Sequence, residues 1–341
     1  FRLHPETLSD FAAYADDTAV LDELADIKRE NKARLAQFFS DRFNVKVDTS
    51  SIFDVQVKRI HEYKRQTLNV LRIIAQYNYL LENPNAEFAP VTYIFGGKAA
   101  PGYYLAKDII KLIWSLGREI ENTPRVRELI RVVYLEDYSV SNAELLIPAS
   151  DISEQISLAG KEASGTGCMK FMINGAVTLG TYDGANIEIV ECAGEENNYI
   201  FGARVEELTR LRPHYNPRTV YESSSVVRRA VDSLVDDSIL NAVYTLPQDS
   251  GAKEEARRVF TEVYNSLLTG DWRKPDYYFN LYDLESYIEA KLRAIYDTAD
   301  ERAFARKCLM NTANSGKFSS DRTIREYSEE LWHIRPIPTE E

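Results

Sequence analysis

The 341-residue chain exceeds the roughly 150 residues typical of one domain, although one large α/β sheet with additional helices could contain it. Its 44% hydrophobic and 28% charged residues exclude a largely disordered protein. The formal net charge of −12 excludes a general attraction to nucleic acid or to an anionic membrane, so any phosphate site must be locally basic.

Helical and strand patterns alternate through the first half of the chain. Apolar residues at helical spacing predict a helix over 21–38 that ends before Asn44, and the alternating "IFDVQVK" predicts a strand. A helix over about 61–81 follows. The order then repeats as the strand "VTYIF", the loop "GGKAAPG" and a helix over 103–116. The third strand, "RVVYL", is followed by a short helix that Asp151 and Glu154 would open as a capping box.

The rest of the chain is predicted to complete and cover this sheet. The segments "AVTLGTYDGANIEIV" and "NYIFG" indicate two further short strands, and helices are expected over 223–234, 251–268, 284–296 and 323–332. Strands that alternate with helices predict a Rossmann-like parallel α/β sheet with helices on both faces, plus C-terminal helical cover. We expect residues 1–210 to form this core and 211–341 a mainly helical continuation. Ligands bind such sheets at the carboxyl ends of the strands.

The cysteines and histidines give no indication of a metal site. The three cysteines and four histidines are scattered without metal-ligand spacing. No apolar run reaches the roughly 18 residues of a membrane span, and the first residues do not form a signal peptide. We therefore expect a cytoplasmic protein with reduced thiols, no bound metal and no membrane or nucleic-acid partner.

The stretch "KEASGTGCMKFMING" is the strongest candidate site. Gly165 and Gly167 precede a short helix that the Asn-Gly pair at 174–175 would end, and a glycine-rich turn at a helix start can bind an anion. The spacing fits neither a Walker A loop nor the GxGxxG dinucleotide motif. Most lysines on helices are solvated, but the apolar neighbours of Lys170 predict a buried helix. A buried lysine has a lowered pKa and can form a Schiff base with an aldehyde such as pyridoxal 5'-phosphate (PLP).

The stretch "VKRIHEYKRQ" provides a second candidate, because it places four basic residues at the end of the first strand. One interpretation is a charged helix start in which Lys58 and Glu62 form a weak pair. The alternative is a phosphate site, since this end of the strand faces the ligand crevice of a parallel sheet. From the residues alone, the loop 95–103, Tyr63, Tyr138, Glu162 and Ser164 remain ambiguous, and His61 is best explained as a structural histidine.

Several of these stretches together resemble one enzyme family. "EASGTGCMKFMINGAVTLGTYDGANIEI" is similar to the PLP segment of the α-glucan (glycogen, starch or maltodextrin) phosphorylases. The blocks "FDVQVKRIHEYKRQ", "IFGGKAAPGY", "IPASDISEQIS" and "SGKFSSDRTIREY" resemble others of the family in the family's order, from about residue 51 to 332. The resemblance implies the C-terminal half of a glycosyltransferase B fold, with the larger N-terminal domain missing from this chain.

The resemblance also implies the residues that hold the cofactor. Lys170 would form the Schiff base with PLP, and main-chain N–H groups of Thr166 and Gly167 would bind its phosphate with help from Lys58. Tyr138 would line the cofactor pocket. Cys168 stands where the family usually has asparagine.

The implied reaction is reversible phosphorolysis of an α-1,4-glucan to α-glucose 1-phosphate with retention. Arg59 and Lys64 would hold the substrate phosphate, Lys64 also lying beside the cofactor phosphate. The hydroxyls of the glucosyl unit would be contacted by Tyr63, Glu162, Ser164 and Gly165. Ser139 stands where many members have arginine, so the local charge is one unit lower.

The resemblance implies a homodimer for the full-length protein and an inactive fragment. Two other functions are compatible with the residues: a PLP-free nucleotide-sugar glycosyltransferase domain, and a non-catalytic assembly module built on the C-terminal helices. Covalent attachment of PLP would distinguish the phosphorylase from the PLP-free glycosyltransferase.

Overall fold

The strands and helices alternate as the sequence predicts, and all strands are parallel. The computed structural model describes residues 4–236, 238–239, 250–270, 273–335 and 337. The sheet has the strand order β3-β2-β1-β4-β5-β6. Its strands are β1 (Ile52–Val57), β2 (Val91–Gly96), β3 (Ile130–Leu135), β4 (Ile152–Gln155), β5 (Val177–Gly180) and β6 (Tyr199–Ile200).

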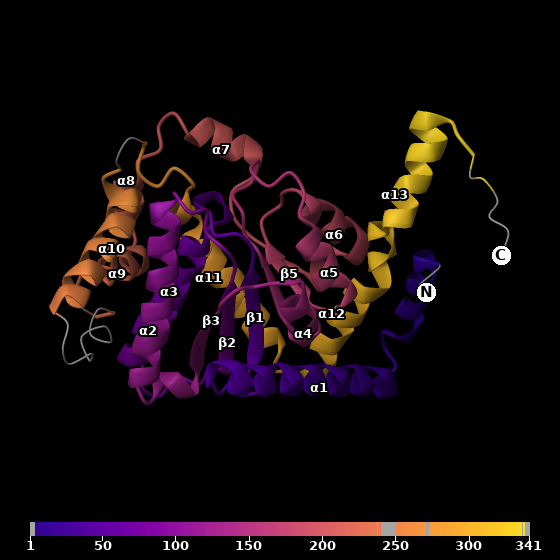
Figure 1. The fold of residues 1–341 in the computed structure, drawn as a ribbon, viewed down its shortest axis with the longest axis horizontal. Helices are drawn as coiled ribbons and strands as arrows, with labels where there is room; N and C mark the ends of the chain where they lie inside the picture. The colour runs from indigo at the N-terminus through magenta and orange to yellow at the C-terminus, as the bar shows by residue number, and fades with distance from the viewer. Residues whose placement is uncertain (1–3, 237, 240–249, 271–272, 336, 338–341) are drawn as a thin grey trace.

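The α-helices surround this sheet on both faces, which confirms the predicted α/β class (Figure 1). They are α1 (Thr18–Phe43), α2 (Gln66–Glu82), α3 (Tyr104–Asn122), α4 (Val140–Ala149), α5 (Thr166–Ile173), α6 (Ala185–Ala193), α7 (Val205–Leu211), α8 (Pro217–Ser223), α9 (Ser225–Asp232), α10 (Ser250–Leu268), α11 (Asn280–Asp297), α12 (Glu301–Ala313) and α13 (Ser320–Glu326). Shorter helical turns are η1 (Pro5–Tyr14), η2 (Glu62–Lys64), η3 (Val126–Glu128), η4 (Glu195–Asn197), η6 (Asn314–Phe318) and the π-helical η7 (Tyr327–Trp332).

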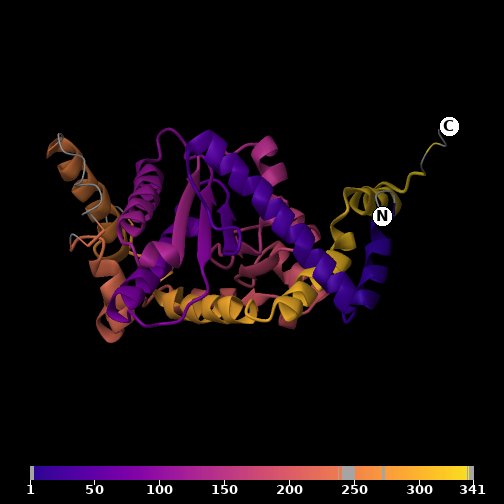
Figure 2. The ribbon, with the colours of Figure 1, turned by 90° about the horizontal axis from the view of Figure 1, so that it is seen from below.

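Each face of the sheet has its own hydrophobic core, because strand side chains alternate between the faces. Phe53 and Val55 of β1 pack with Leu35 and Phe39 of α1 and with α4. The opposite face packs against α2, α3 and α11. Figure 2 shows α1 and α11 on opposite sides of the sheet, so α11 provides the predicted C-terminal helical cover of one face.

Strand β1 is more deeply buried than its alternating sequence predicts. Asp54 and Gln56 are each 1% exposed, although an alternating strand usually turns its polar face to water. Asp54 is buried because Lys291 of α11 forms ion pairs with both Asp54 and Glu154 of β4. The predicted strand is confirmed, and it is a largely buried central strand.

Two predicted helix starts are wrong. Asp151 and Glu154 do not cap a helix: Asp151 precedes β4 and accepts a hydrogen bond from the Phe53 N–H at 2.7 Å, while Glu154 lies within β4. The third helix is instead α4, capped by Ser139. Helix α2 begins at Gln66 rather than near residue 61, because Arg65 adopts a left-handed conformation with φ 57°.

The sheet order changes direction between β1 and β4. From β1 the chain builds outward through β2 and β3, and then returns to add β4, β5 and β6 on the other side. A crevice forms at the carboxyl ends of the two strands that flank such a switch point. Residues that follow β1 and β4 are therefore placed to contact a ligand.

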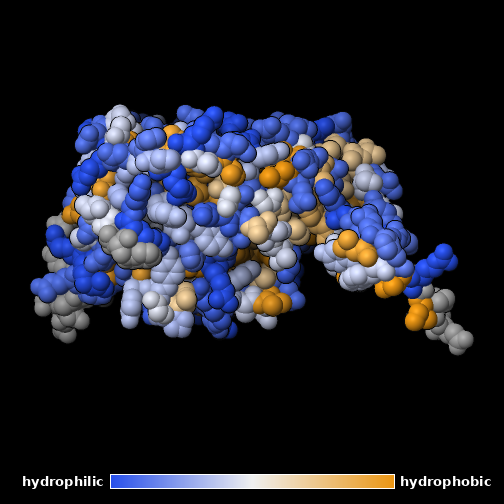
Figure 3. Space-filling view, turned by 90° about the horizontal axis from the view of Figure 1, so that it is seen from above, coloured by the Kyte–Doolittle hydropathy of each residue, from blue (hydrophilic) through white to orange (hydrophobic). Residues whose placement is uncertain are grey.

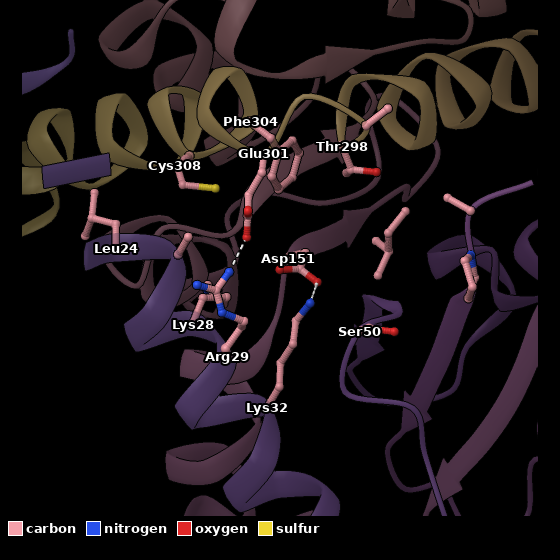
Figure 4. A pocket seen from close by; sticks show the side chains of 16 residues that line it. Leu24, Lys28, Arg29, Lys32, Ser50, Asp151, Thr298, Glu301, Phe304 and Cys308 are labelled. Carbon is pink, nitrogen blue, oxygen red and sulfur yellow. Dashed lines mark hydrogen bonds and ion pairs between the residues drawn. The ribbon is translucent and has the colours of Figure 1, made fainter. Parts of the chain in front are cut away.

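The helix α1 lies along the opposite, amino-end edge of the sheet (Figure 1). Figure 4 shows its Lys32 pointing towards Asp151, with Nζ 2.5 Å from the carboxylate oxygen. Nearby, Lys28 Nζ donates hydrogen bonds to the main-chain oxygens of Pro148, Ser150 and Asn174 at 2.7–3.2 Å. One lysine thus joins α1 to the ends of both α4 and α5.

The segment from α13 to residue 335 projects from the body (Figure 1). Seen from the carboxyl-end side, most of the surface is hydrophilic, but this segment shows hydrophobic residues (Figure 3). The exposed large hydrophobic residues there include Ile324, Tyr327, Leu331, Trp332 and Ile334. None of the helices in the described residues combines the length and hydropathy that a membrane crossing requires.

Candidate functional site

Lys58 occupies the switch point of the sheet. It follows β1 directly, and its Nζ donates a 2.9 Å hydrogen bond to Gln155 Oε1 at the end of β4. Gly97 approaches the main chain of Lys58 so closely that a Cβ there would lie 1.9 Å from the Lys58 oxygen. Glycine at this position, with φ 150°, allows the loop after β2 to close over Lys58.

Burial gives the Lys58 amine an unusual pKa. Loss of water, reinforced by the positive charge of Lys64, lowers the pKa of Lys58 from 10.5 to about 8. Such an amine exchanges a proton near neutral pH, and it gains most from an anion beside it.

Lys64 and Glu162 form the second charged pair of the site. Lys64 Nζ lies 2.6 Å from Glu162 Oε2, which also accepts a 3.0 Å hydrogen bond from Ser157 Oγ. Burial opposes both charges, but the ion pair outweighs it and raises the pKa of Lys64 while lowering that of Glu162. The pair therefore stays ionised, with Lys64 Nζ also 4.6 Å from the centre of the Tyr63 ring.

A contact between two loops fixes Glu162. The Asp183 carboxylate accepts hydrogen bonds from the main-chain N–H groups of Lys161 and Glu162, at 3.3 and 3.0 Å. Gly184 has φ 52°, and a Cβ there would lie 2.7 Å from the Glu162 oxygen. The loops after β4 and β5 can meet only because residue 184 is glycine.

The glycine-rich turn opens α5, as the sequence predicts. Gly165 is the N-cap, no side chain among the described residues caps the helix, and the helix ends at Asn174. The first N–H groups of a helix lack internal partners, and the helix dipole favours an anion beside them. A Cβ on Gly167 would meet nothing within 4 Å, so local packing does not require this glycine. The first turn of α5 therefore has open space in front of it.

Cys168 is buried at the start of α5 rather than free to react. Its Sγ donates to the Gly165 oxygen at 2.8 Å, and burial raises the pKa of the thiol. In this way the thiol supports the turn from within the helix.

Lys170 lies one turn into α5, but the prediction that it is buried is wrong. Its side chain is exposed, whereas its neighbour Phe171 is 2% exposed and Met172 is fully buried. The apolar neighbours face the two hydrophobic cores, and Lys170 occupies the remaining face of this short helix. Burial therefore does not activate the Lys170 amine in this chain.

One cavity of about 130 Å³ brings together part of the predicted site. Predicted residues that line it are Lys58, Lys64, Glu162, Gly165 and Gly167. Three further predicted residues are exposed and adjoin lining residues in the sequence: Arg59, Ser164 and Thr166. Tyr63 is half-buried and precedes Lys64. Tyr138 does not line this cavity. It packs against the hydrophobic core between α1 and the sheet.

Sequence reasoning missed several residues of the same cavity. They are Gln155, Ser157, Thr181, Asp183 and Asn186. Gln155 ends β4 and Thr181 follows β5, so each could have been found by asking which residues follow a strand. The incorrect capping box at Asp151 and Glu154 concealed β4 and, with it, Gln155.

The interpretation of the basic stretch as a charged helix start with a Lys58–Glu62 pair is wrong. Lys58 does not pair with Glu62, because a 3-10 turn separates β1 from α2. Glu62 instead pairs with Arg273 at 2.6 Å and accepts a hydrogen bond from the Tyr103 hydroxyl. His61 Nδ1 accepts a hydrogen bond from the Tyr63 N–H, which is consistent with a structural role.

Ser139, which follows Tyr138, has a local structural role. Ser139 is exposed, and its Oγ caps α4 by accepting a hydrogen bond from the Asn142 N–H at 3.4 Å. Burial raises the pKa of Tyr138.

Comparison with known proteins gives extended matches. Residues 1–334 match the family described as carbohydrate phosphorylase. The chain is 44% identical over 330 residues to the liver form of glycogen phosphorylase from Homo sapiens, which covers 96% of this chain and 37% of that protein. It is 43% identical over 332 residues to the muscle form from Bos taurus, with 97% and 37% covered. Glycogen phosphorylase of Bacillus subtilis is 44% identical over 335 residues, with 98% and 40% covered. The chain thus spans well under half the length of these relatives.

Proposed function

Because the chain belongs to the carbohydrate phosphorylase family, we propose that it is the PLP-carrying C-terminal part of an α-1,4-glucan phosphorylase. The proposed reaction is reversible phosphorolysis of the glucan to α-glucose 1-phosphate with retention. The observation that carries the proposal is the cavity at the switch point, where Lys58 and Lys64 face the open first turn of α5.

The residues of this cavity fit a bound PLP. The space before Gly167 and the uncapped N–H groups of α5 suit a phosphate, and Lys58 supplies a cation beside them. Lys170, one turn further along the same helix, would anchor the aldehyde. When bound, PLP would supply a phosphate group that can exchange a proton with inorganic phosphate.

Three basic side chains would hold the second phosphate against the first. Two neighbouring phosphates repel each other unless cations lie between them. Glu162 keeps Lys64 charged, and Lys58 can share its proton near neutral pH. The Arg59 side chain is exposed to solvent. We propose that Lys64 and Arg59 orient the substrate phosphate and that Lys58 adjusts proton sharing.

Glu162 is proposed to contact a glucosyl hydroxyl. Its carboxylate accepts from Lys64 and Ser157, and an ionised carboxylate has capacity for further donors. Tyr63, Ser164 and Gly165 lie on the same two loops and would contact other hydroxyls. This arrangement would keep the transferred sugar directly beside the substrate phosphate.

We propose that the chain alone is inactive. Lys170, Thr166 and Arg59 are exposed, so the site has a wall on one side only. A further part of the full-length protein would supply the opposite wall, and the hydrophobic residues from α13 onward offer a surface for contact with it. The full-length protein is proposed to form a homodimer in the cytoplasm.

Reduction with borohydride tests the attachment of PLP. The full-length protein is reduced, digested and mapped by mass spectrometry, and a pyridoxyl group is expected on Lys170. Lys170→Ala should abolish glucose 1-phosphate formation while the circular dichroism spectrum is unchanged; Lys161→Ala, on the preceding loop, is the matched control. An unmodified Lys170 in wild-type protein would favour the PLP-free glycosyltransferase alternative, and undiminished activity of Lys170→Ala would contradict the proposed role.

A further inference from the structure

Gln155 contacts Lys58 inside the proposed cofactor site. It is the last residue of β4, and its Oε1 accepts the 2.9 Å hydrogen bond from Lys58 Nζ. Both side chains line the cavity in front of α5. The contact spans the switch point of the sheet, where β1 and β4 are neighbours. Gln155 is therefore placed to set the position of the Lys58 amine.

The main chain of Gln155 is fixed by the strand and helix that follow it. Gln155 pairs with Gly180 in the parallel register of β4 and β5. Its main-chain oxygen accepts hydrogen bonds from the Thr181 N–H at 3.2 Å and from Asn186 Nδ2 at 2.9 Å. The side chain of Gln155 therefore starts from a fixed point at the edge of the sheet.

The orientation of the Gln155 amide is also determined. An ammonium group only donates hydrogen bonds, so Lys58 must face the amide oxygen and not the amide NH₂ group. The NH₂ group then points to Ser153 Oγ, which accepts from Gln155 Nε2 at 2.8 Å. Ser153 is fully buried within β4. Since the amide is bonded at both ends, it presents its oxygen to Lys58 in one position.

Gln155 is neutral, which leaves the charge of Lys58 without a direct counterion. Among the described residues, no carboxylate forms an ion pair with Lys58. Two carboxylates line the same cavity, but each has donors of its own: Glu162 pairs with Lys64, and Asp183 accepts from two main-chain N–H groups. The pKa of Lys58, about 8, keeps most of the amine charged at pH 7. An anion that enters the cavity therefore meets a fixed and unpaired cation.

We propose that Gln155 is a positioning residue, which holds Lys58 beside the first turn of α5 as an unpaired cation and thereby gives the cavity its preference for the cofactor phosphate. The inference rests on the proposed function, in which this cavity binds PLP. A carboxylate at position 155 would pair with Lys58 and compete with the phosphate for its charge. A side chain without the amide oxygen would leave the amine free to move.

The preference for PLP over pyridoxal measures this role. The two compounds carry the same ring and aldehyde, so reaction with Lys170 cancels in the ratio of their dissociation constants, and only the phosphate differs. Full-length protein freed of cofactor is titrated with each compound at pH 7, and binding is followed by absorbance. Wild-type protein should bind PLP at least about a hundredfold more tightly than pyridoxal, because several charge-assisted hydrogen bonds go to the phosphate.

Two variants of Gln155 should lower this preference. Gln155→Glu should lower the ratio at least about tenfold, and Gln155→Met, which keeps the volume without the amide oxygen, should lower it about threefold to tenfold. The affinity for pyridoxal should stay unchanged in both variants. Gln37→Glu, which makes the same charge change at an exposed position of α1, is the matched control and should keep the wild-type ratio.

The outcomes separate this inference from the proposed function. An undiminished ratio in Gln155→Glu, or in Gln155→Met if the first variant does not fold, would overturn the inference and leave the proposed function in place. An equal loss of affinity for both compounds would show a structural role only and would also overturn it. Equal affinities of wild-type protein for PLP and pyridoxal would contradict the proposed phosphate site itself and the inference with it.

Discussion

At the scale of single residues, the site depends on how burial changes the charge of each lysine. Lys58 and Lys64 are six residues apart, yet their pKa values move in opposite directions, because within the described part of the chain Lys64 pairs with a carboxylate and Lys58 with the neutral Gln155. Lys170 is exposed although its neighbours are buried. The three lysines are therefore suited to three different tasks: Lys58 to sharing a proton, Lys64 to holding a charge and Lys170 to contacting a group outside the helix.

Phosphate affinity of the full-length protein should fall as pH rises through about 8, because Lys58 is charged below its pKa and neutral above it. Lys58→Met should weaken phosphate binding about tenfold to a hundredfold near pH 7 and lose this step. Titration of phosphate affinity at several pH values measures both effects. Phosphate itself titrates equally in both proteins, so the difference between them isolates Lys58. Lys161→Met, at an exposed lysine, should keep the step, and a step that persists in Lys58→Met would contradict the assignment.

At the scale of elements, two lysines far apart in the sequence fix helices to the sheet. Lys28 joins α1 to the ends of α4 and α5, and Lys291 joins α11 to β1 and β4. In each case one lysine amine contacts several oxygen atoms at once. They determine where α5 and α11 lie, and α5 carries the proposed anchor for the cofactor.

Lys28→Met should loosen the C-terminal end of α5, because it removes the three hydrogen bonds to Pro148, Ser150 and Asn174. The expected loss of stability is about 1.5–3 kcal/mol. Hydrogen exchange of the peptide covering 166–176 should become faster. Arg29→Met is the matched control, since Arg29 forms only exposed ion pairs with Asp26 and Glu301 and should cost less than about 1 kcal/mol. Equal exchange in the two variants would refute the role of Lys28.

Lys291→Met should destabilise the fold by about 3–5 kcal/mol, because it leaves two carboxyl groups buried without their cation. Urea unfolding of the full chain measures the change. Lys274→Met, at an exposed lysine, should stay within about 0.5 kcal/mol of wild type. Combining Lys291→Met with Asp54→Asn and Glu154→Gln should recover part of the loss. A Lys291→Met variant as stable as Lys274→Met would show that the buried ion pairs are not needed.

At the scale of the whole molecule, the proposed site is open on one side. The cavity at the switch point is lined by loops after β1, β4 and β5, while Lys170 and Thr166 face outward. The chain also spans only 37% of the length of the human liver relative. The proposed function accordingly assigns the rest of the catalytic cleft to residues outside this chain.

The 341-residue chain alone should form no detectable glucose 1-phosphate from glucan and phosphate, whereas the full-length protein should form it readily. The reason is that one wall alone neither excludes water nor orients both substrates. A coupled assay for glucose 1-phosphate compares the two, with circular dichroism to verify that the chain is folded. Turnover by the folded chain would contradict the proposed division of the active site.

Local sequence patterns determined the parallel sheet, the short α5 and the position of most helices. Strand and helix periodicities reflect the alternation of buried and exposed positions, and Asn174 and Gly175 end α5 through their own backbone preferences. Both errors at helix starts have the same origin. Arg65 and Asp151 obtain their conformations from partners distant in the chain, Asp283 and Lys32 respectively, which no local pattern contains.

The sequence by itself determined the α/β class, the glycine-rich turn before α5 and the basic stretch after β1, because each depends on neighbouring residues. Only the tertiary structure decided that Lys58 meets Gln155, that Lys64 pairs with Glu162 and that Lys170 is exposed. It also decided that Asp54 is buried with Lys291. These outcomes follow from which strands become neighbours, and the charge of a buried group depends on neighbours that are 97 to 237 residues away in the chain.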